Sequence, residues 1–238
     1  MTAMLPPAIL FDLDDTIIAA GERPAVLLEV ASEFADRLGP HAPTHVADRM
    51  ESAMTDFWSD PERHKAARFG LAAARRGVAV QVFTTELGLG AGDAMVFADR
   101  FSEIRERMTE MFPGARETLE AIRARGVRMA LVTNGDGTTQ RAKIERFTLA
   151  GLFDHIQIEG ENGFGKPEER AYLHAMQALD VRADQTWMVG DNLEWEVAAP
   201  QRLGIFAIWH DPRGQGLPSG SPIRPDRIIR RLSELLDA

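Results

Sequence analysis

A short apolar run near the start of the chain, Ile9-Leu10-Phe11, is followed by carboxylates at Asp12 and Asp14. Apolar runs of this length, bounded by polar residues, are typical of strands buried in a sheet. In parallel sheets the chemistry lies at the carboxyl ends of the strands, where the loops open. Since alternate strand residues share a face, Asp12 and Asp14 are expected to point the same way. Two close carboxylates repel each other unless a cation neutralises them, so this stretch predicts an anionic site suited to Mg²⁺.

The same two aspartates have a second interpretation at this point. Acidic residues after a strand often cap the next helix or hold a turn, with no chemical role. The pattern of the rest of the chain has to distinguish the two.

Residues 22–111 follow a helical pattern, and residues 17–21 before them fit a small hairpin or flap that ends at Gly21. Apolar residues recur there at intervals of three and four, with Pro and Gly at the interruptions. Residues 79–87 have some strand propensity, but their helical surroundings favour helix. The helices predicted in this block cover 24–38, 44–58, a segment from Pro61 that pauses at Gly77, 79–87 and 93–111.

From residue 113 the chain alternates between strand and helix patterns. Such alternation predicts an α/β fold, a doubly wound parallel sheet with helices on both faces. Residues 1–21 and 112–238 then form the α/β core domain, and residues 22–111 form an inserted all-α cap domain. The predicted strands are 127–132, 155–159, 187–189, 205–209 and an edge strand at 228–229; the predicted helices are 115–125, 139–149, 168–179, 193–202 and 232–236.

Composition narrows the function classes. The chain has 36 acidic and 27 basic residues among 238, a formal charge of -9, which argues against binding to nucleic acid or to an anionic membrane. It has no cysteine, so disulfides, thiolate metal sites and a cysteine nucleophile are excluded. No secretory signal and no apolar run of membrane-spanning length is evident, and a cytoplasmic location is expected.

Polar residues follow several of the predicted strands. Thr133-Asn134 comes after 127–132, Asp191 comes after 187–189, and Lys166 lies in a Gly-bounded loop. Each alone is compatible with a turn, a cap or a surface charge. Together they supply a nucleophilic carboxylate, an acid/base, phosphoryl donors and a metal ligand, which is the set that phosphoryl transfer needs.

Four motifs in this order resemble the haloacid dehalogenase (HAD) superfamily of hydrolases, in the branch with a helical cap after the first strand. They are Asp12-Leu13-Asp14-Asp15-Thr16, Thr133-Asn134-Gly135, Lys166-Pro167 and Gly190-Asp191-Asn192. The resemblance covers essentially the whole chain and implies a Rossmann-like core.

The resemblance also implies a role for each matching residue. Asp12 is the nucleophile, and Asp14 is the general acid/base that also offers its backbone carbonyl to Mg²⁺. Thr133 and the Asn134 amide bind the transferring phosphoryl group, together with Lys166, which steadies its charge and that of Asp12. Asp191 completes a metal site with Asp12 and Asp14.

One position departs from the family pattern. The last motif usually has a second aspartate five places after Asp191, and this chain has Glu196 there. Glu196 could support a metal-bound water or Lys166, with Asn192 as another supporting candidate. It is equally compatible with a solvated helix residue.

An acid at Asp14 favours a phosphatase, because related dehalogenases lack one at that place. The resemblance implies a Mg²⁺-dependent phosphatase of small phosphorylated metabolites, such as nucleoside monophosphates or sugar phosphates, acting as a monomer or homodimer. The alternatives are a phosphomutase, a phosphonate hydrolase, a dehalogenase, or a non-catalytic phospho-acceptor or binding module. Cap residues that could select the substrate, although packing or solvation is the commoner role, are Arg23, Trp58, Arg63, His64 and Arg68.

Overall fold

The computed structural model describes residues 5–237. The chain forms two compact units, described here separately: an α/β unit of residues 5–19 and 111–237, and a helical unit of Ala20–Glu110. None of the helices in residues 5–237 has the length and apolar character needed to cross a membrane.

Within the described residues, six parallel strands form the sheet of the α/β unit, in the order β5-β4-β1-β6-β7-β8. The first strand therefore lies in the middle, between β4 and β6. This confirms the predicted doubly wound parallel sheet. The strands are β1 (Ala8–Phe11), β4 (Arg128–Thr133), β5 (His155–Ile158), β6 (Thr186–Gly190), β7 (Phe206–His210) and β8 (Arg227–Ile229).

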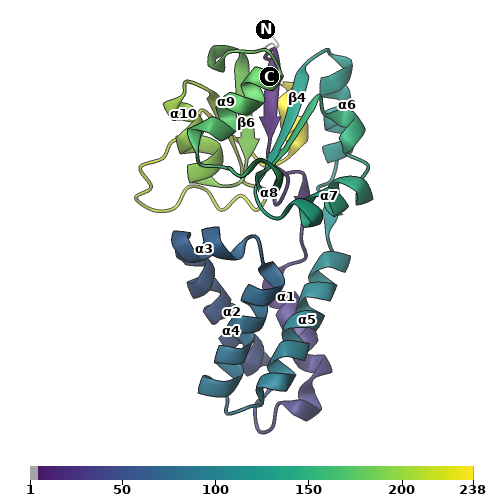
Figure 1. Cartoon of the computed structure of the whole chain (residues 1–238), viewed down its shortest axis with the longest axis vertical. Coiled ribbons are helices and arrows are strands. Elements are labelled where there is room, and N and C mark those ends of the chain that lie inside the picture. The colour runs from purple at the N-terminus through teal and green to yellow at the C-terminus, as the bar shows by residue number, and fades with distance from the viewer. Residues whose placement is uncertain (1–4, 238) are drawn as a thin grey trace. The chain divides into compact units, whose positions relative to one another are not determined.

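Alternate residues of β1 pack against opposite helical layers, as strand geometry requires. Ile9 and Phe11 lie in one apolar core with residues of α6 (Ala115–Ala124) and α7 (Gly137–Arg146). Ala8 and Leu10 lie in another with residues of α9 (Glu169–Ala178). Figure 1 shows α6 and α9 on opposite sides of the sheet. The central strand β1 is thus buried on both faces, and the polar side chains beside it lie where it ends.

The register of β1 with its neighbours sets the position of the strand ends. Phe11 pairs with Leu131 of β4 on one side and with Val189 of β6 on the other. Asp12, Thr133 and Asp191 each follow these three paired residues by one or two positions. The three segments predicted to carry chemistry therefore end at the same edge of the sheet.

The helices of the α/β unit follow the predicted alternation, with two differences. The loop that carries Lys166 is preceded by the short helix α8, and residues 193–202, predicted as one helix, start with a π-helical segment before α10. The helices are α6 (Ala115–Ala124), α7 (Gly137–Arg146), α8 (Glu159–Asn162), α9 (Glu169–Ala178), the π-helical Leu193–Ala198, α10 (Ala199–Arg202) and the 3₁₀ segments Ala150–Leu152, Ala183–Gln185 and Leu232–Asp237.

The helical unit has its own apolar core, in which Phe97 packs against Phe34 and Phe83 with ring centroids 5.5 and 5.3 Å apart. Residues 79–87 are helical, as the surroundings indicated. The helices are α1 (Arg23–Glu33), the 3₁₀ turn Ala35–Arg37, α2 (Pro43–Ser59), α3 (Pro61–Ala67), α4 (Leu71–Gln81), the π-helical Val82–Glu86 and α5 (Ala91–Arg107).

Two local predictions for residues 17–111 were wrong. The pause expected at Gly77 occurs at Gly70, whose φ of −147° and ψ of 50° are not helical, while Gly77 lies inside α4. Residues 17–21 do not pair with each other as a hairpin; instead β2 (Ile18–Ala19) pairs with β3 (Glu110–Met111), and the helix expected to reach residue 111 ends at Arg107. A two-residue strand has too few positions to show an alternating pattern.

Candidate active site

The Asp12 carboxylate lies at the end of β1 and is only 7% exposed. Its backbone N–H donates to the carbonyl of Val189 at 3.0 Å, which extends the β1–β6 ladder by one residue. Its Oδ2 accepts a hydrogen bond from Thr16 Oγ1 at 3.0 Å, and its Oδ1 lies 2.6 Å from Lys166 Nζ. The Asp12 carboxylate is therefore held in place by two donors on different segments. The contact from Thr16 had not been predicted from the sequence.

Lys166 is buried, with 1% of its surface exposed, and its ammonium bridges two carboxylates. Nζ lies 2.6 Å from Asp12 Oδ1 and 2.7 Å from Glu196 Oε1. Burial disfavours the ammonium, but the Asp12 and Glu196 carboxylates outweigh it and hold the pKa of Lys166 above its ordinary value. The Lys166 charge is thus permanent at neutral pH.

The backbone around Lys166 is fixed by the Asn134 side chain. Asn134 Nδ2 donates to the carbonyl of Lys166 at 2.7 Å, and Asn134 Oδ1 accepts from the Lys166 N–H at 2.8 Å. A Cβ on Gly165 would lie 2.5 Å from Asn134 Oδ1, so the close approach requires glycine there. The Asn134 side chain positions the lysine loop, which leaves its backbone amide as the group for the predicted phosphoryl contact.

Glu196 is buried rather than solvated, with 1% exposure. Besides its contact with Lys166, its Oε2 accepts from the backbone N–H of Asn192 at 2.8 Å. Burial raises its pKa to about 7, although Lys166 opposes the shift and Asp12 adds to it. A Cβ on Gly190 would lie 2.0 Å from Glu196 Cγ, so the extra methylene of this glutamate occupies the space that glycine leaves.

Asp191 and Asn192 follow β6 and differ in what they do. The Asn192 side chain accepts from the N–H groups of Glu194 and Trp195, both at 3.0 Å, and so caps the helical segment after it. Asp191 is partly buried, and its pKa is raised well above the ordinary value by burial and by the nearby carboxylates of Glu196 and Asp12. Asp191 is thus the member of the pair whose surroundings favour a cation.

Asp14 is more exposed, and two residues of α7 hold both of its oxygens. Lys143 Nζ lies 2.7 Å from Oδ1, and Gln140 Nε2 donates to Oδ2 at 2.8 Å. Gln140 Nε2 also donates to the hydroxyl of Thr133 at 2.6 Å, and Gln140 Oε1 accepts from Lys143 at 2.8 Å. Gln140 and Lys143 were not predicted from the sequence, because polar residues three positions apart are common on helices and carry no signal of a functional role.

The predicted metal ligands suit Mg²⁺ by the chemistry of their donors. No cluster of three histidine, aspartate or glutamate side chains that could hold a metal occurs in residues 5–237. The predicted set needs only two such side chains, Asp12 and Asp191, because Asp14 contributes a carbonyl oxygen. Mg²⁺ is commonly bound through one or two carboxylates, with water and substrate phosphate at the remaining positions. The raised pKa of Asp191 reflects a field that a cation would relieve.

The candidate substrate residues of the helical unit are engaged within that unit. Arg23 forms two hydrogen bonds to Glu51, at 2.5 and 2.6 Å. The rings of Trp58 and His64 pack edge to face, with centroids 5.3 Å apart, and the Arg63 guanidinium lies over the Phe57 ring. Arg68 is buried.

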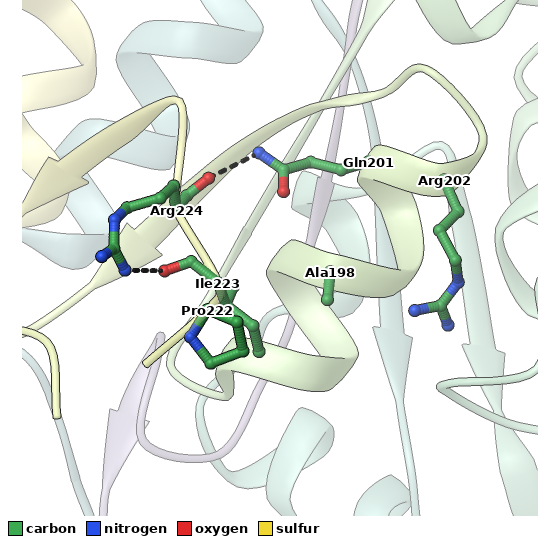
Figure 2. A pocket seen from close by; sticks show the side chains of 6 residues that line it. All are labelled: Ala198, Gln201, Arg202, Pro222, Ile223 and Arg224. Carbon is green, nitrogen blue, oxygen red and sulfur yellow. Dashed lines mark hydrogen bonds between the residues drawn. The ribbon is translucent and has the colours of Figure 1, made fainter. Parts of the chain in front are cut away.

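A pocket of about 460 Å³ lies elsewhere on the α/β unit, between α10 and the segment before β8. Figure 2 shows Gln201 donating to the carbonyl of Arg224, and Arg224 in turn donating to that of Ile223. Arg202, on the same wall, pairs with Glu194 at 3.0 Å. The pocket contains none of the residues predicted for catalysis, and its polar groups bind one another.

Comparison with known proteins agrees with the motifs and the fold. A family model described as haloacid dehalogenase-like hydrolase matches residues 6–204. The chain is 30% identical to the ribulose-1,5-bisphosphate 5-phosphatase of Halopiger xanaduensis, over 97% of this chain and 98% of that protein. It is 31% identical to the phosphoserine phosphatase of Thermus thermophilus, over 95% and 96%. The HAD-hydrolase YfnB of Bacillus subtilis, a structure described as bound to magnesium, superposes with a TM-score of 0.71 at 23% identity, over 98% of this chain and 97% of that one.

The chain belongs to the haloacid dehalogenase-like hydrolases. This confirms the predicted family and, with the two full-length phosphatase relatives, the predicted enzyme class, a hydrolase acting on phosphate monoesters.

Proposed function

We propose that the protein is a Mg²⁺-dependent phosphatase of small phosphorylated metabolites that works through an aspartyl-phosphate on Asp12. The observation that carries this proposal is the state of the Asp12 carboxylate. It is nearly buried at the strand-end edge of the sheet, and Lys166 and Thr16 hold one oxygen each. A carboxylate that is fixed and partly desolvated, yet paired with a cation, is prepared to act as a nucleophile.

In the first step an Asp12 oxygen attacks phosphorus, and the bond from phosphorus to the ester oxygen breaks. Each Asp12 oxygen has a further lone pair beyond the one used in its present hydrogen bond, so attack does not require release of Lys166. The Lys166 ammonium and the Thr133 hydroxyl stabilise the charge on the phosphoryl oxygens. Asp14, in its protonated form, gives its proton to the departing alkoxide.

In the second step water attacks the phosphorus of the aspartyl-phosphate. Asp14, now ionised, takes the proton from that water, and the bond between phosphorus and the Asp12 oxygen breaks. Inorganic phosphate leaves and Asp12 is regenerated as a carboxylate. One carboxyl group thus serves as acid and then as base, which the same position can do because the two steps are chemically the reverse of each other.

The side chains of Asp12 and Asp191 and the carbonyl of Asp14 would hold the Mg²⁺. When bound, the ion supplies positive charge that neutralises the substrate phosphate beside the Asp12 carboxylate. The surrounding carboxylates, Glu196 among them, make the site negative enough to need that charge.

The substrate class is proposed from the relatives and from the composition. Relatives of nearly full length are named for ribulose-1,5-bisphosphate and phosphoserine, which are small organic phosphates. We propose that residues 22–111 form a cap that selects among such molecules. A cytoplasmic location and a monomeric or homodimeric state remain predictions.

An assay with 4-nitrophenyl phosphate, with and without Mg²⁺, tests the proposal, and a panel of phosphorylated metabolites then ranks substrates. Turnover that depends on Mg²⁺ and is lost in Asp12→Asn is expected. Transfer of phosphate to a second position of the same sugar would indicate a phosphomutase. A long-lived phosphoprotein without turnover would indicate a phospho-acceptor module. Unchanged turnover in Asp12→Asn would exclude Asp12 as the nucleophile.

A further inference from the structure

Gln140 is a nearly buried amide, 2% exposed, on a helix whose other polar residues, apart from the half-buried Lys143, are exposed. Its side chain contacts three groups: the hydroxyl of Thr133, Oδ2 of Asp14 and the ammonium of Lys143. The oxygen and the nitrogen of this buried amide bind different partners. Moving the side chain would therefore leave buried polar groups without hydrogen bonds, which destabilises the folded protein.

The charges of the neighbours fix the orientation of this amide. The NH₂ group must face the Asp14 carboxylate, and the carbonyl oxygen must face the Lys143 ammonium, because the flipped amide would oppose like partners at both ends. The two N–H bonds of Gln140 therefore go to Asp14 and to Thr133. Thr133 accepts this hydrogen bond, so its own O–H is the donor. That O–H makes only a long contact with the carbonyl of Asn134, at 3.4 Å, which a phosphoryl oxygen can replace.

The helix α7 places Gln140 and Lys143 on the same side, since residues three apart are neighbours on a helix surface. Asp136 caps the first turn by accepting from the N–H of Thr139 at 2.9 Å, and Ile144 is buried in the core. These contacts fix how α7 is rotated. Arg141, on another side of the helix, pairs instead with Glu161 at 2.6 Å.

We propose that Gln140 and Lys143 are positioning residues for the acid/base step, which hold the Asp14 carboxylate in place and fix the Thr133 hydroxyl as a phosphoryl donor. Lys143 contacts Asp14 directly and also donates to Gln140 Oε1, but it does not contact Thr133. Gln140 acts on both, so it links the group that binds the phosphoryl oxygens to the group that protonates the ester oxygen.

Because this role depends on the proposed function of Asp14, it predicts an effect that varies with the leaving group. Nitrophenolate departs as a stable anion and needs little protonation, whereas phenolate needs more. kcat/KM covers the steps up to departure of the leaving group, so it reports the acid step and not the later hydrolysis. Loss of Asp14 positioning should therefore lower kcat/KM more for phenyl phosphate than for 4-nitrophenyl phosphate.

The experiment measures kcat/KM on both esters for Lys143→Met, Lys143→Arg, Gln140→Leu and the control Arg141→Met, with thermal unfolding of each variant. Since a general acid contributes about 10²–10⁴-fold, we expect Lys143→Met to lose roughly 10-fold or more on phenyl phosphate and about 2-fold on 4-nitrophenyl phosphate. Lys143→Arg, which keeps the donor, should recover part of this selectivity. Gln140→Leu should lower both values, with the larger loss on phenyl phosphate.

Equal losses on the two esters in Lys143→Met, or variants that match Arg141→Met, would overturn the positioning role. A second test places Lys143→Met in an Asp14→Asn background under single-turnover conditions. If Lys143 acts through Asp14, the second substitution should change the rate by no more than about 2-fold, and an undiminished effect would contradict the inference. Asp12→Asn, measured in parallel, distinguishes failure of the proposed function from failure of the positioning role. Full activity of Asp12→Asn rejects the proposed function. Loss of activity in Asp12→Asn, with no effect of the Lys143 and Gln140 substitutions, rejects only the positioning role.

Discussion

Lys166 Nζ lies 2.6 Å from Asp12 Oδ1, although the two residues are 154 positions apart in the chain. Each partner of this contact is positioned by a different part of the structure. The central strand β1 carries Asp12 to the edge of the sheet, and the Asn134 side chain holds the backbone of Lys166 there. The ammonium then has Glu196 as its second carboxylate partner.

Replacement of Lys166 by Met should damage both activity and stability. It leaves the buried carboxylates of Asp12 and Glu196 without a cation, and breaking a buried ion pair from one side costs about 3–5 kcal/mol. Removal of a charged group that stabilises the transition state typically lowers kcat by about 100-fold or more. Urea unfolding without Mg²⁺ and steady-state kinetics measure the two effects.

The control is Arg182→Met, which removes an exposed ion pair with Asp184 on the same unit. It should change neither quantity measurably, because exposed pairs contribute little. Equal stability of Lys166→Met and Arg182→Met would contradict the interpretation of Lys166 as the neutralising cation.

Glu196 should make the stability depend on pH. Burial holds its pKa at about 7, above the ordinary value of 4.5, with Lys166 opposing the shift. The folded protein therefore binds this proton more tightly than the unfolded chain, so the group favours folding at low pH, and that contribution is lost as the pH rises through 7. Relative to Glu196→Gln, the wild-type free energy of unfolding should fall by up to about 3 kcal/mol between about pH 4.5 and pH 8.

Unfolding curves at several pH values, recorded without divalent ions, test this directly. Glu196→Gln keeps every other titrating group. The difference in free energy of unfolding between the two proteins therefore reports the titration of residue 196 alone. A difference that stays constant with pH would mean that Glu196 is already ionised throughout the range in the folded protein.

Gly190→Ala, at the end of β6, should lower the stability of the folded protein and disturb the position of Glu196. The added methyl group would lie 2.0 Å from Glu196 Cγ, so Glu196 or the end of β6 must move. Overpacking of this kind costs about 1–3 kcal/mol and would displace the partner of Lys166. Gly151→Ala is the matched control, because its methyl group would meet nothing within 4 Å. If both variants unfold at the same urea concentration, the close approach at Gly190 has no energetic consequence.

Asp191→Asn should weaken the response to Mg²⁺ without removing the nucleophile. Loss of one carboxylate from a site with two lowers the affinity for a divalent ion, and we expect the half-saturating Mg²⁺ concentration to rise about 10- to 100-fold. Titration of activity with Mg²⁺ measures this, with Asp184→Asn as an exposed control. An unchanged titration would remove Asp191 from the metal site.

Much of the α/β unit could be predicted from the sequence, because buried parallel strands leave short apolar runs with polar residues at one end. The runs around Ile9 and Val132 are visible without any structure. Asp12 and Thr133 were identifiable because each follows such a run, and Lys166 because it lies in a glycine-rich loop between Gly163 and Pro167.

The parts that escaped prediction depend on contacts between distant segments. Gln140 and Lys143 are ordinary polar residues of a helix, and only the rotation of α7 relative to the end of β1 brings them to Asp14. The β2–β3 pair joins segments about ninety residues apart and leaves no local pattern. Whether Glu196 is buried at the site or exposed to solvent depends on the space beside Gly190. The sequence alone does not show that the two residues are in contact.

The measurement that tests the central claim most directly is the detection of phosphate on Asp12. Asp14→Asn should slow the second step more than attack on an activated ester, so 4-nitrophenyl phosphate followed by an acid quench should leave the intermediate in place. The account predicts that the peptide containing Asp12 gains the mass of one phosphoryl group, and that this gain is absent from Asp12→Asn, which also lacks turnover. The account would be contradicted if Asp12→Asn turned over substrate at the wild-type rate and the Asp12 peptide of Asp14→Asn carried no phosphate.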